Sequence, residues 1–187
     1  MDRRTREGNN QKLAGDFALG LLTVSGSLEG PIQKDKSSFL FSVRRTFVDT
    51  WIRSVTEALN DNTGNSSIYF FDVNAKVNFQ IGRKSKIFFS YYQGNDHFDK
   101  MFETVDPDED TNGFFSDLDE LQWDSGNRLA TFKWNAGLSQ KLFLNTNIYA
   151  SNYSFDSFDH DRIDQLDENM MFIDGPYTAG YYQTKVS

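Results

Sequence analysis

The stretch FDVNAKVNFQI, residues 71–81, decides the fold because apolar and polar side chains alternate along it without interruption. Successive side chains of a β-strand point to opposite faces, whereas a helix would scatter the apolar residues around its circumference. One face then carries Phe71, Val73, Ala75, Val77, Phe79 and Ile81, and the other carries Asp72, Asn74, Lys76, Asn78 and Gln80. The stretch therefore predicts a strand that separates an apolar surface from a hydrated one.

Similar alternation predicts about seven strands in the whole chain, and hence an all-β fold. The other segments with this pattern are 16–21, 22–30, 38–49, 86–93, 127–136 and 142–153. Residues 86–93 contain IFFSYY, which is aromatic on both sides, so the sequence leaves the two faces of this strand undecided. Arg45 interrupts the apolar side of 38–49, and we expect it to lie near an interface or to mark a bulge.

The connections between these strands alternate in length. Turns such as Gly82–Ser85 and Gly137–Gln140 are short, while 50–67, 94–123 and 156–187 are long and polar, and WIRSVTEAL within 50–67 can form one or two helical turns. Short turns at one end, long loops at the other and strands with one apolar face are typical of an antiparallel transmembrane β-barrel. We therefore divide the chain into a lead-in (1–11), a strand region (12–155) and an irregular acidic loop (156–187).

Composition narrows the class of protein further. The chain has 187 residues, of which 38% are hydrophobic and 16% aromatic, and it contains no cysteine. No apolar run reaches the roughly 18 residues of a membrane helix, so any contact with a bilayer must be made by strands. The net charge of −8 and the scattered basic residues argue against nucleic acid as a partner. The first residues lack the apolar core of a secretory signal, so no signal peptide is expected in this chain.

One acidic segment has the spacing of a calcium-binding loop. Asp108, Asp110 and Asn112 offer oxygen ligands at alternate positions, Gly113 follows at the sixth, and Asp119 lies at the twelfth. The twelfth residue is shorter than the usual glutamate and no helical pattern flanks the loop, so an EF-hand is not expected. Two interpretations remain: a weak calcium site, or a solvated acidic loop without a metal.

No catalytic constellation is evident, and we do not expect an enzyme or a cofactor other than calcium. His97 and His160 lie in separate segments, with no serine elbow or metal-ligand spacing beside them. Arg44 and Arg45 can steer anionic solutes or serve structure alone. The polar row of 71–81 is expected to face the interior of a barrel, where it bonds to a neighbouring strand or domain rather than to a substrate.

Several segments resemble the first part of the barrel of TonB-dependent outer-membrane receptors of the Bacteroidetes type. They are REGNNQK (6–12), LEGPIQKDKSSFLFSVRRTF (28–47), YFFDVNAKVNFQIGRKSKIFFSYYQGND (69–96) and SGNRLATFKWNAGLSQKLFLNTNIYASNYSF (125–155). The resemblance covers about residues 3–155. It implies a location in the outer membrane of a Gram-negative bacterium and a complete barrel of about 22 strands.

This family implies energised uptake of a scarce nutrient such as a siderophore, a vitamin or a glycan. The implied partners are membrane lipid, a plug domain, the rest of the barrel, the TonB complex and a small-molecule or oligosaccharide ligand. The plug and the TonB-contacting segment, which the family places before REGNN, are not in this sequence, so a fragment of a receptor is expected. Two alternatives stay open: a passive porin or structural barrel, and a soluble carbohydrate-binding β-sandwich whose aromatic face forms a dry core.

Overall fold

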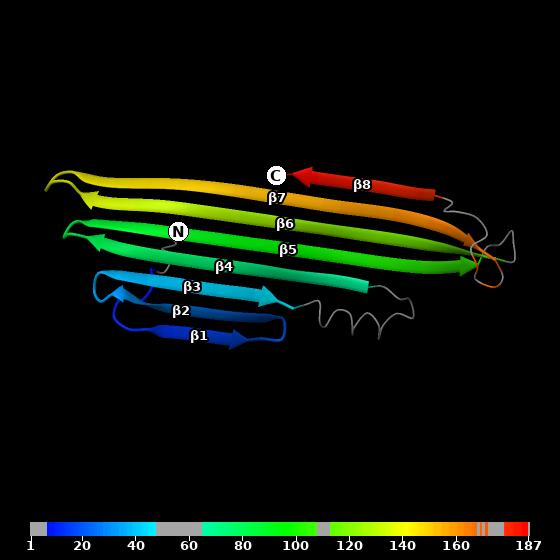
Figure 1. The fold of residues 1–187 in the computed structure, drawn as a ribbon, viewed down its shortest axis with the longest axis horizontal. Coiled ribbons are helices and arrows are strands. Elements are labelled where there is room, and N and C mark those ends of the chain that lie inside the picture. The colour runs from blue at the N-terminus through cyan, green and yellow to red at the C-terminus, as the bar shows by residue number, and fades with distance from the viewer. Residues whose placement is uncertain are drawn as a thin grey trace. The chain divides into compact units, whose positions relative to one another are not determined.

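The computed structural model describes residues 7–47, 65–107, 113–167, 169, 171 and 178–186. These residues form one antiparallel sheet whose strands follow the order of the chain, from β1 to β8 (Figure 1). The strands are β1 (Ala14–Leu19), β2 (Thr23–Gln33), β3 (Ser37–Thr46), β4 (Asn65–Ile81), β5 (Ser85–Pro107), β6 (Phe114–Gly137), β7 (Phe143–Leu166) and β8 (Thr178–Val186). Within these ranges no helix has the length and apolarity needed to cross a membrane.

The chain forms two compact units. Unit 1 comprises Met1–Thr46, Phe70–Asn95 and Gly126–Tyr153, and unit 2 comprises Phe47–Tyr69, Asp96–Ser125 and Ser154–Ser187. Strands β1–β3 thus belong to unit 1 and β8 to unit 2, while β4–β7 contribute residues to both.

The register of unit 1 extends the apolar row of 71–81 over three more strands. Phe39, Phe41 and Val43 of β3 pair with Val77, Ala75 and Val73 of β4. Further pairs on this face are Leu28 with Phe41, Gly26 with Val43, Phe17 with Gly26 and Leu19 with Val24. Directly paired residues of an antiparallel sheet share a face. The predicted two-faced strand is therefore confirmed as part of a two-faced sheet.

The turns of unit 1 follow from local sequence. The amide of Gly20 donates to the carbonyl of Thr23 at 2.8 Å, which places a turn where the predicted segments 16–21 and 22–30 meet. Strand β2 does not end at Gly30 but continues through Pro31, and its register shifts between Pro31 and Gln33. A bulge of this kind accommodates a residue that cannot donate a ladder hydrogen bond.

Unit 2 corrects the prediction that 94–123 and 156–187 are irregular. Strand β5 continues to Pro107, β6 begins at Phe114 and β7 continues to Leu166. Strand β8 adds a partner for β7, with Asp156 opposite Lys185 and Ile163 opposite Thr178. The prediction was wrong because both faces of these segments mix polar and apolar residues, so no alternation marks them as strands. Ladder hydrogen bonds and cross-strand side-chain pairs hold them instead. The helical turns suggested within 50–67 fall on 51–59, outside the described residues.

Candidate functional site

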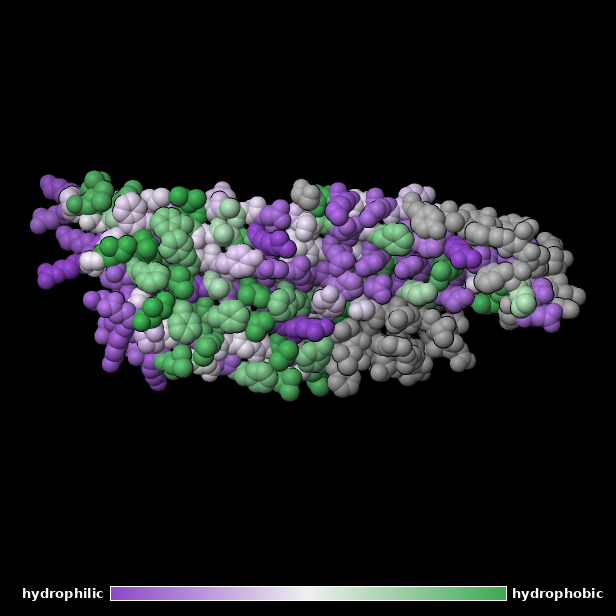
Figure 2. All heavy atoms as spheres, viewed as in Figure 1, coloured by the Kyte–Doolittle hydropathy of each residue, from purple (hydrophilic) through white to green (hydrophobic). Residues whose placement is uncertain are grey.

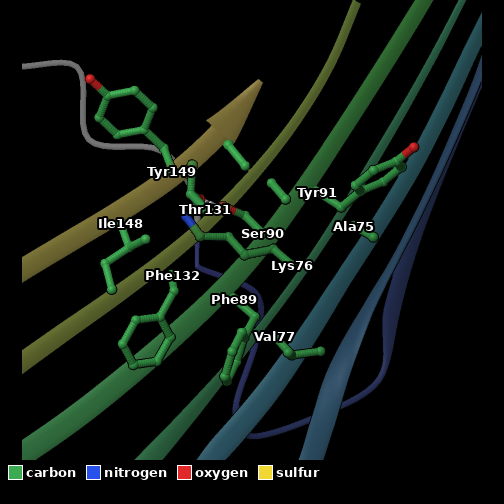
Figure 3. Close-up of a pocket in the computed structure, with 12 residues that line it drawn as sticks. Ala75, Lys76, Val77, Phe89, Ser90, Tyr91, Thr131, Phe132, Ile148 and Tyr149 are labelled. Carbon is green, nitrogen blue, oxygen red and sulfur yellow. Dashed lines mark hydrogen bonds between the residues drawn. The ribbon is translucent and has the colours of Figure 1, made fainter. Parts of the chain in front are cut away.

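The apolar face of unit 1 bears a groove of about 470 Å³ (Figure 3). Strands β4, β5, β6 and β7 each contribute small or aromatic side chains to it, and at its centre the rings of Phe89 and Phe132 lie 5.0 Å apart. The apolar residues that line it include Ala75, Val77, Phe89, Phe132, Ile148 and Ala150. The groove is therefore mostly hydrophobic, although Lys76, Ser90, Tyr91, Thr131 and Tyr149 also contribute to its lining.

This apolar face is uncovered. Phe17 is 74% exposed, Ile148 is 60% exposed, and Leu19, Phe41 and Phe89 are also exposed. Hydrophobic side chains gather on this part of the molecule in Figure 2. Soluble proteins rarely leave so large a contiguous apolar surface in water, so the face needs an apolar medium or a partner.

The opposite face of unit 1 is polar and hydrogen-bonded. Arg44 Nε donates to Asp72 Oδ2 at 2.8 Å, and the hydroxyl of Tyr92 donates to Asp72 Oδ1 at 2.8 Å. Asp72 thus joins three strands, because Arg44 lies on β3 and Tyr92 on β5. Beside these groups lies a second groove of about 420 Å³, which Asp16, Ser27, Arg44, Asp72, Asn74 and Tyr92 help to line.

The N-terminal lead-in binds to this polar face through Asn78. Asn78 is only 2% exposed, and its Nδ2 donates to Ser38 Oγ at 2.6 Å and to the carbonyl of Glu7 at 2.8 Å. The Glu7 carboxylate also lies 2.7 Å from the ammonium of Lys86. Gly8 follows with φ of +87°, and a Cβ there would lie 2.6 Å from the carbonyl oxygen of Phe39. Glycine therefore permits the close approach of lead-in and sheet.

The structure places four of the five predicted interior residues on one face. Asp72, Asn74, Lys76 and Asn78 pair with Arg44, Ser42, Leu40 and Ser38 of β3. Gln80, the fifth, donates its side-chain amide to the carbonyl of Gly82 in the adjoining turn at 3.1 Å. Asn78 bonds to Ser38 of the neighbouring strand and to Glu7 of the lead-in. Arg45 pairs opposite Phe71, one residue before the end of β3, and so lies on the apolar face close to a strand end.

The two faces of 86–93, which the sequence left undecided, are resolved by cross-strand contacts. Phe89 contacts Phe132 on the apolar face, whereas Tyr92 reaches Asp72 on the polar face. Phe88 is buried on that polar side, where the ammonium groups of Lys86 and Lys133 lie 5.1 and 5.9 Å from its ring centre. Cation–π contacts let an aromatic ring occupy a polar surface.

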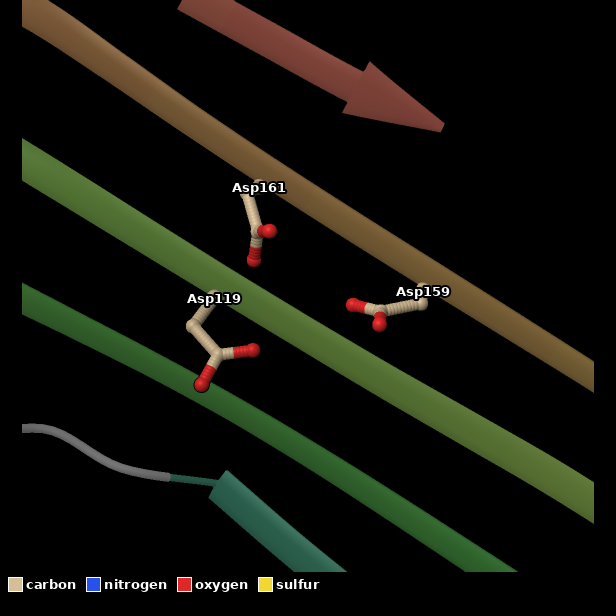
Figure 4. A group of neighbouring side chains, drawn as sticks. All are labelled: Asp119, Asp159 and Asp161. Carbon is tan, nitrogen blue, oxygen red and sulfur yellow. The ribbon is translucent and has the colours of Figure 1, made fainter. Parts of the chain in front are cut away.

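The structure describes only part of the predicted calcium site. Asp108, Asp110 and Asn112 lie outside the described residues, and Asp119 lies inside β6. There Asp119 joins Asp159 and Asp161 of β7, with one carboxylate oxygen of each within 4.8 Å of the others (Figure 4). Lys100 lies 3.5 Å from Asp119 and offsets part of this charge. Sequence spacing gave no sign of Asp159 and Asp161, because only strand pairing brings them to Asp119.

The two histidines both lie in unit 2 and each has a carboxylate neighbour. His97 Nδ1 is 2.6 Å from Asp124 Oδ1, and its ring stacks on Tyr69 with the centres 4.8 Å apart. His160 Nδ1 is 3.6 Å from Glu120 Oε2. These contacts join neighbouring strands, so a structural role accounts for both histidines.

Comparison with family models, with curated proteins and with solved structures finds no match to this chain. The class of protein that the described residues define is an all-β protein built on one antiparallel sheet. Any function must therefore be argued from the two faces of this sheet.

Proposed function

We propose that the chain is part of the barrel of a TonB-dependent outer-membrane receptor that imports a scarce nutrient. The observation that carries this proposal is the register of unit 1, which gathers apolar side chains on one exposed face and polar ones on the other. A strand crosses the hydrocarbon core with roughly 9–11 residues, and the alternating segment 71–81 has this length. Lipid is the apolar medium that the proposal assigns to this face.

The polar face supports the same proposal. In a receptor barrel it lines the interior, where Arg44, Asp72 and Tyr92 form a fixed network between strands. The lead-in enters along this face and is held at Glu7 by Asn78 and Lys86. A segment connecting an internal plug to the first strand would follow such a path, which supports a receptor over an empty pore.

The β-sandwich alternative is less well supported. A sandwich covers the apolar face of one sheet with a second sheet about 10 Å away. All eight strands of the described residues belong to a single sheet, so none of them covers the apolar face. A passive porin shares both faces with a receptor and differs only in its energy coupling.

The membrane location can be tested with two neighbouring residues of β4. Ala75 lines the apolar groove, whereas Asn74 is exposed beside the polar groove. A lysine on a lipid-facing position near the midplane costs about 2–4 kcal/mol, but in a hydrated interior it finds water. Ala75→Lys should therefore lower the folded fraction in vesicles, measured by heat-modifiable gel migration, far more than Asn74→Lys. Equal folding of the two variants would contradict the proposal.

Energy coupling needs a separate test in cells. Growth on limiting nutrients is compared among a strain with the protein, one without it and one with a disrupted TonB complex. A receptor predicts that the last two strains share a growth defect on the same nutrient. Uptake that needs the protein but not the TonB complex would establish the porin alternative instead.

A further inference from the structure

Three turns of unit 1 lie side by side at one edge of the sheet. They join β2 to β3, β4 to β5 and β6 to β7. The backbone amide of Gln80, near the end of β4, donates to the carbonyl of Lys36 at 2.8 Å, which brings the first turn beside the start of the second. The Gly137 amide donates to the carbonyl of Lys84 at 2.8 Å, which links the second to the third. The turns therefore form one continuous rim.

This rim is strongly basic. It presents the exposed side chains of Lys34, Lys36, Arg83, Lys84 and Lys141. Its acidic residue is Asp35, which accepts a hydrogen bond from the side-chain amide of Gln11. No ion pair joins these five cations to another residue within the described ranges. The rim thus carries an excess of positive charge, although the chain as a whole is acidic.

Each basic turn is flanked by exposed apolar side chains. Ile32 precedes the first turn, Ile81 precedes the second, and Leu138 and Leu142 enclose Lys141 in the third; each of the four is more than half exposed. The same order, apolar residue and then cation, is repeated three times along the rim. In Figure 2 hydrophilic side chains project beyond the hydrophobic ones at this end. Neighbouring apolar and basic groups of this kind fit the boundary between acyl chains and anionic headgroups.

We propose that the basic rim of unit 1 binds the headgroups of anionic phospholipid in the leaflet beside the turns. The five cations contact headgroup phosphates, while the flanking apolar residues contact the upper acyl chains. An acidic protein would satisfy the cations but leave the apolar residues in water. This inference rests on the proposed membrane location and adds a lipid preference to it.

The test compares vesicles of phosphatidylcholine alone with vesicles that also contain phosphatidylglycerol. Protein unfolded in urea is diluted into each, and the bound fraction is measured by flotation and the folded fraction by heat-modifiable migration. We expect tighter binding to the anionic vesicles, and a loss of this preference at high salt. The double variant Arg83→Gln with Lys84→Gln should lower the ratio of binding to anionic vesicles over binding to neutral ones. We expect a decrease of about fivefold per cation, or about 25-fold for the pair.

Two further variants make the test specific. Lys34→Gln with Lys36→Gln alters another turn of the rim and should act like the first pair. Lys100→Gln with Lys185→Gln removes the same charge from unit 2 and should leave the lipid preference unchanged. Equal binding to both vesicles, or equal losses from rim and control variants, would overturn the lipid preference while leaving the membrane location intact. Protein that stays in the aqueous phase with both vesicles would overturn both proposals.

Discussion

Units 1 and 2 use β-structure in two different ways. In unit 1 the strands have an apolar face and a polar face, and the apolar face is largely exposed. In unit 2 the segments 96–107, 114–125 and 154–166 carry acidic residues on both faces. Their contacts are cross-strand pairs such as Phe98 with Trp123, whose ring centres lie 5.6 Å apart, and Lys185 with Asp156 at 3.2 Å.

This difference teaches that the surrounding medium contributes differently to the stability of the two units. The apolar face of unit 1 needs an apolar medium or a partner, because exposing it to water costs roughly 25 cal/mol per Å². The described strands of unit 2 form no comparable apolar face, and their polar groups can remain hydrated on both sides. If the proposed location is correct, substitutions should respond to lipid in unit 1 and to local pairing in unit 2.

The largest expected effect is a difference in stability between lysine substitutions at two exposed β-branched residues, one in each unit. Ile148 lines the apolar groove of unit 1, whereas Val105, 42% exposed, lies on β5 in unit 2. Ile148→Lys should cost about 2–4 kcal/mol in a bilayer, and Val105→Lys about 0.5 kcal/mol or less. Urea titration of vesicle-embedded protein measures both costs. Similar values would erase the distinction between the units.

The next effect concerns the buried amide on the polar face of unit 1. Asn78→Ala removes the donor to Ser38 Oγ and one of the two side-chain donors to the Glu7 carbonyl, the other being the Ser38 hydroxyl at 3.0 Å, so the free energy of unfolding should fall by about 1–3 kcal/mol. Asn74→Ala serves as the control on the same face and should change it by about 0.5 kcal/mol or less. Denaturant midpoints compare the two variants. If both lose equal stability, the lead-in is not anchored at Asn78.

A smaller effect is expected at the aromatic stack of unit 2. A double-mutant cycle of Phe98→Ala and Trp123→Ala should give a coupling of about 0.5–1.5 kcal/mol. The same cycle on Phe89 and Phe132 provides the comparison in unit 1. Additive losses for Phe98 and Trp123 would mean that the stack does not hold β5 to β6.

The smallest effect is a local response to pH after β7. The carboxylate of Asp167 accepts hydrogen bonds from the amides of Met171 and Asn169, both at 2.8 Å. These bonds lower the pKa of Asp167 below its ordinary value of 3.8, and the bond from the Met171 amide has the largest effect. Because the pKa is lowered, the hydrogen bonds contribute fully to local order at pH values above the ordinary pKa. Their contribution is lost as the pH falls through the lowered pKa. The Met171 amide shift in NMR should therefore change in acid, and should not change in Asp167→Ala.

The sequence predicted the fold where alternation is strong and missed it where both faces mix polar and apolar residues. The side-chain pattern predicted strands over 38–49, 71–81, 127–136 and 142–153, and these ranges overlap β3, β4, β6 and β7. The extension of β5 past Gly94 and the strand β8 were missed, because cross-strand pairs such as His97 with Asp124 leave no periodic signal. The candidate calcium residues were chosen from the spacing of a calcium-binding loop. The acidic cluster around Asp119 could not be found in this way, because its other members lie on β7.

The sequence by itself determined which side chains of 71–81 share a face, because a period of two follows from strand geometry alone. It also determined that the chain is rich in aromatic residues and acidic overall. Only the tertiary structure decided which residues of other strands lie beside them, how Phe88 and Phe89 divide between the faces, and that Asn78 is buried beneath the lead-in. Register joins residues far apart in the chain, and a shift of one residue would exchange every face, so local pattern cannot specify it.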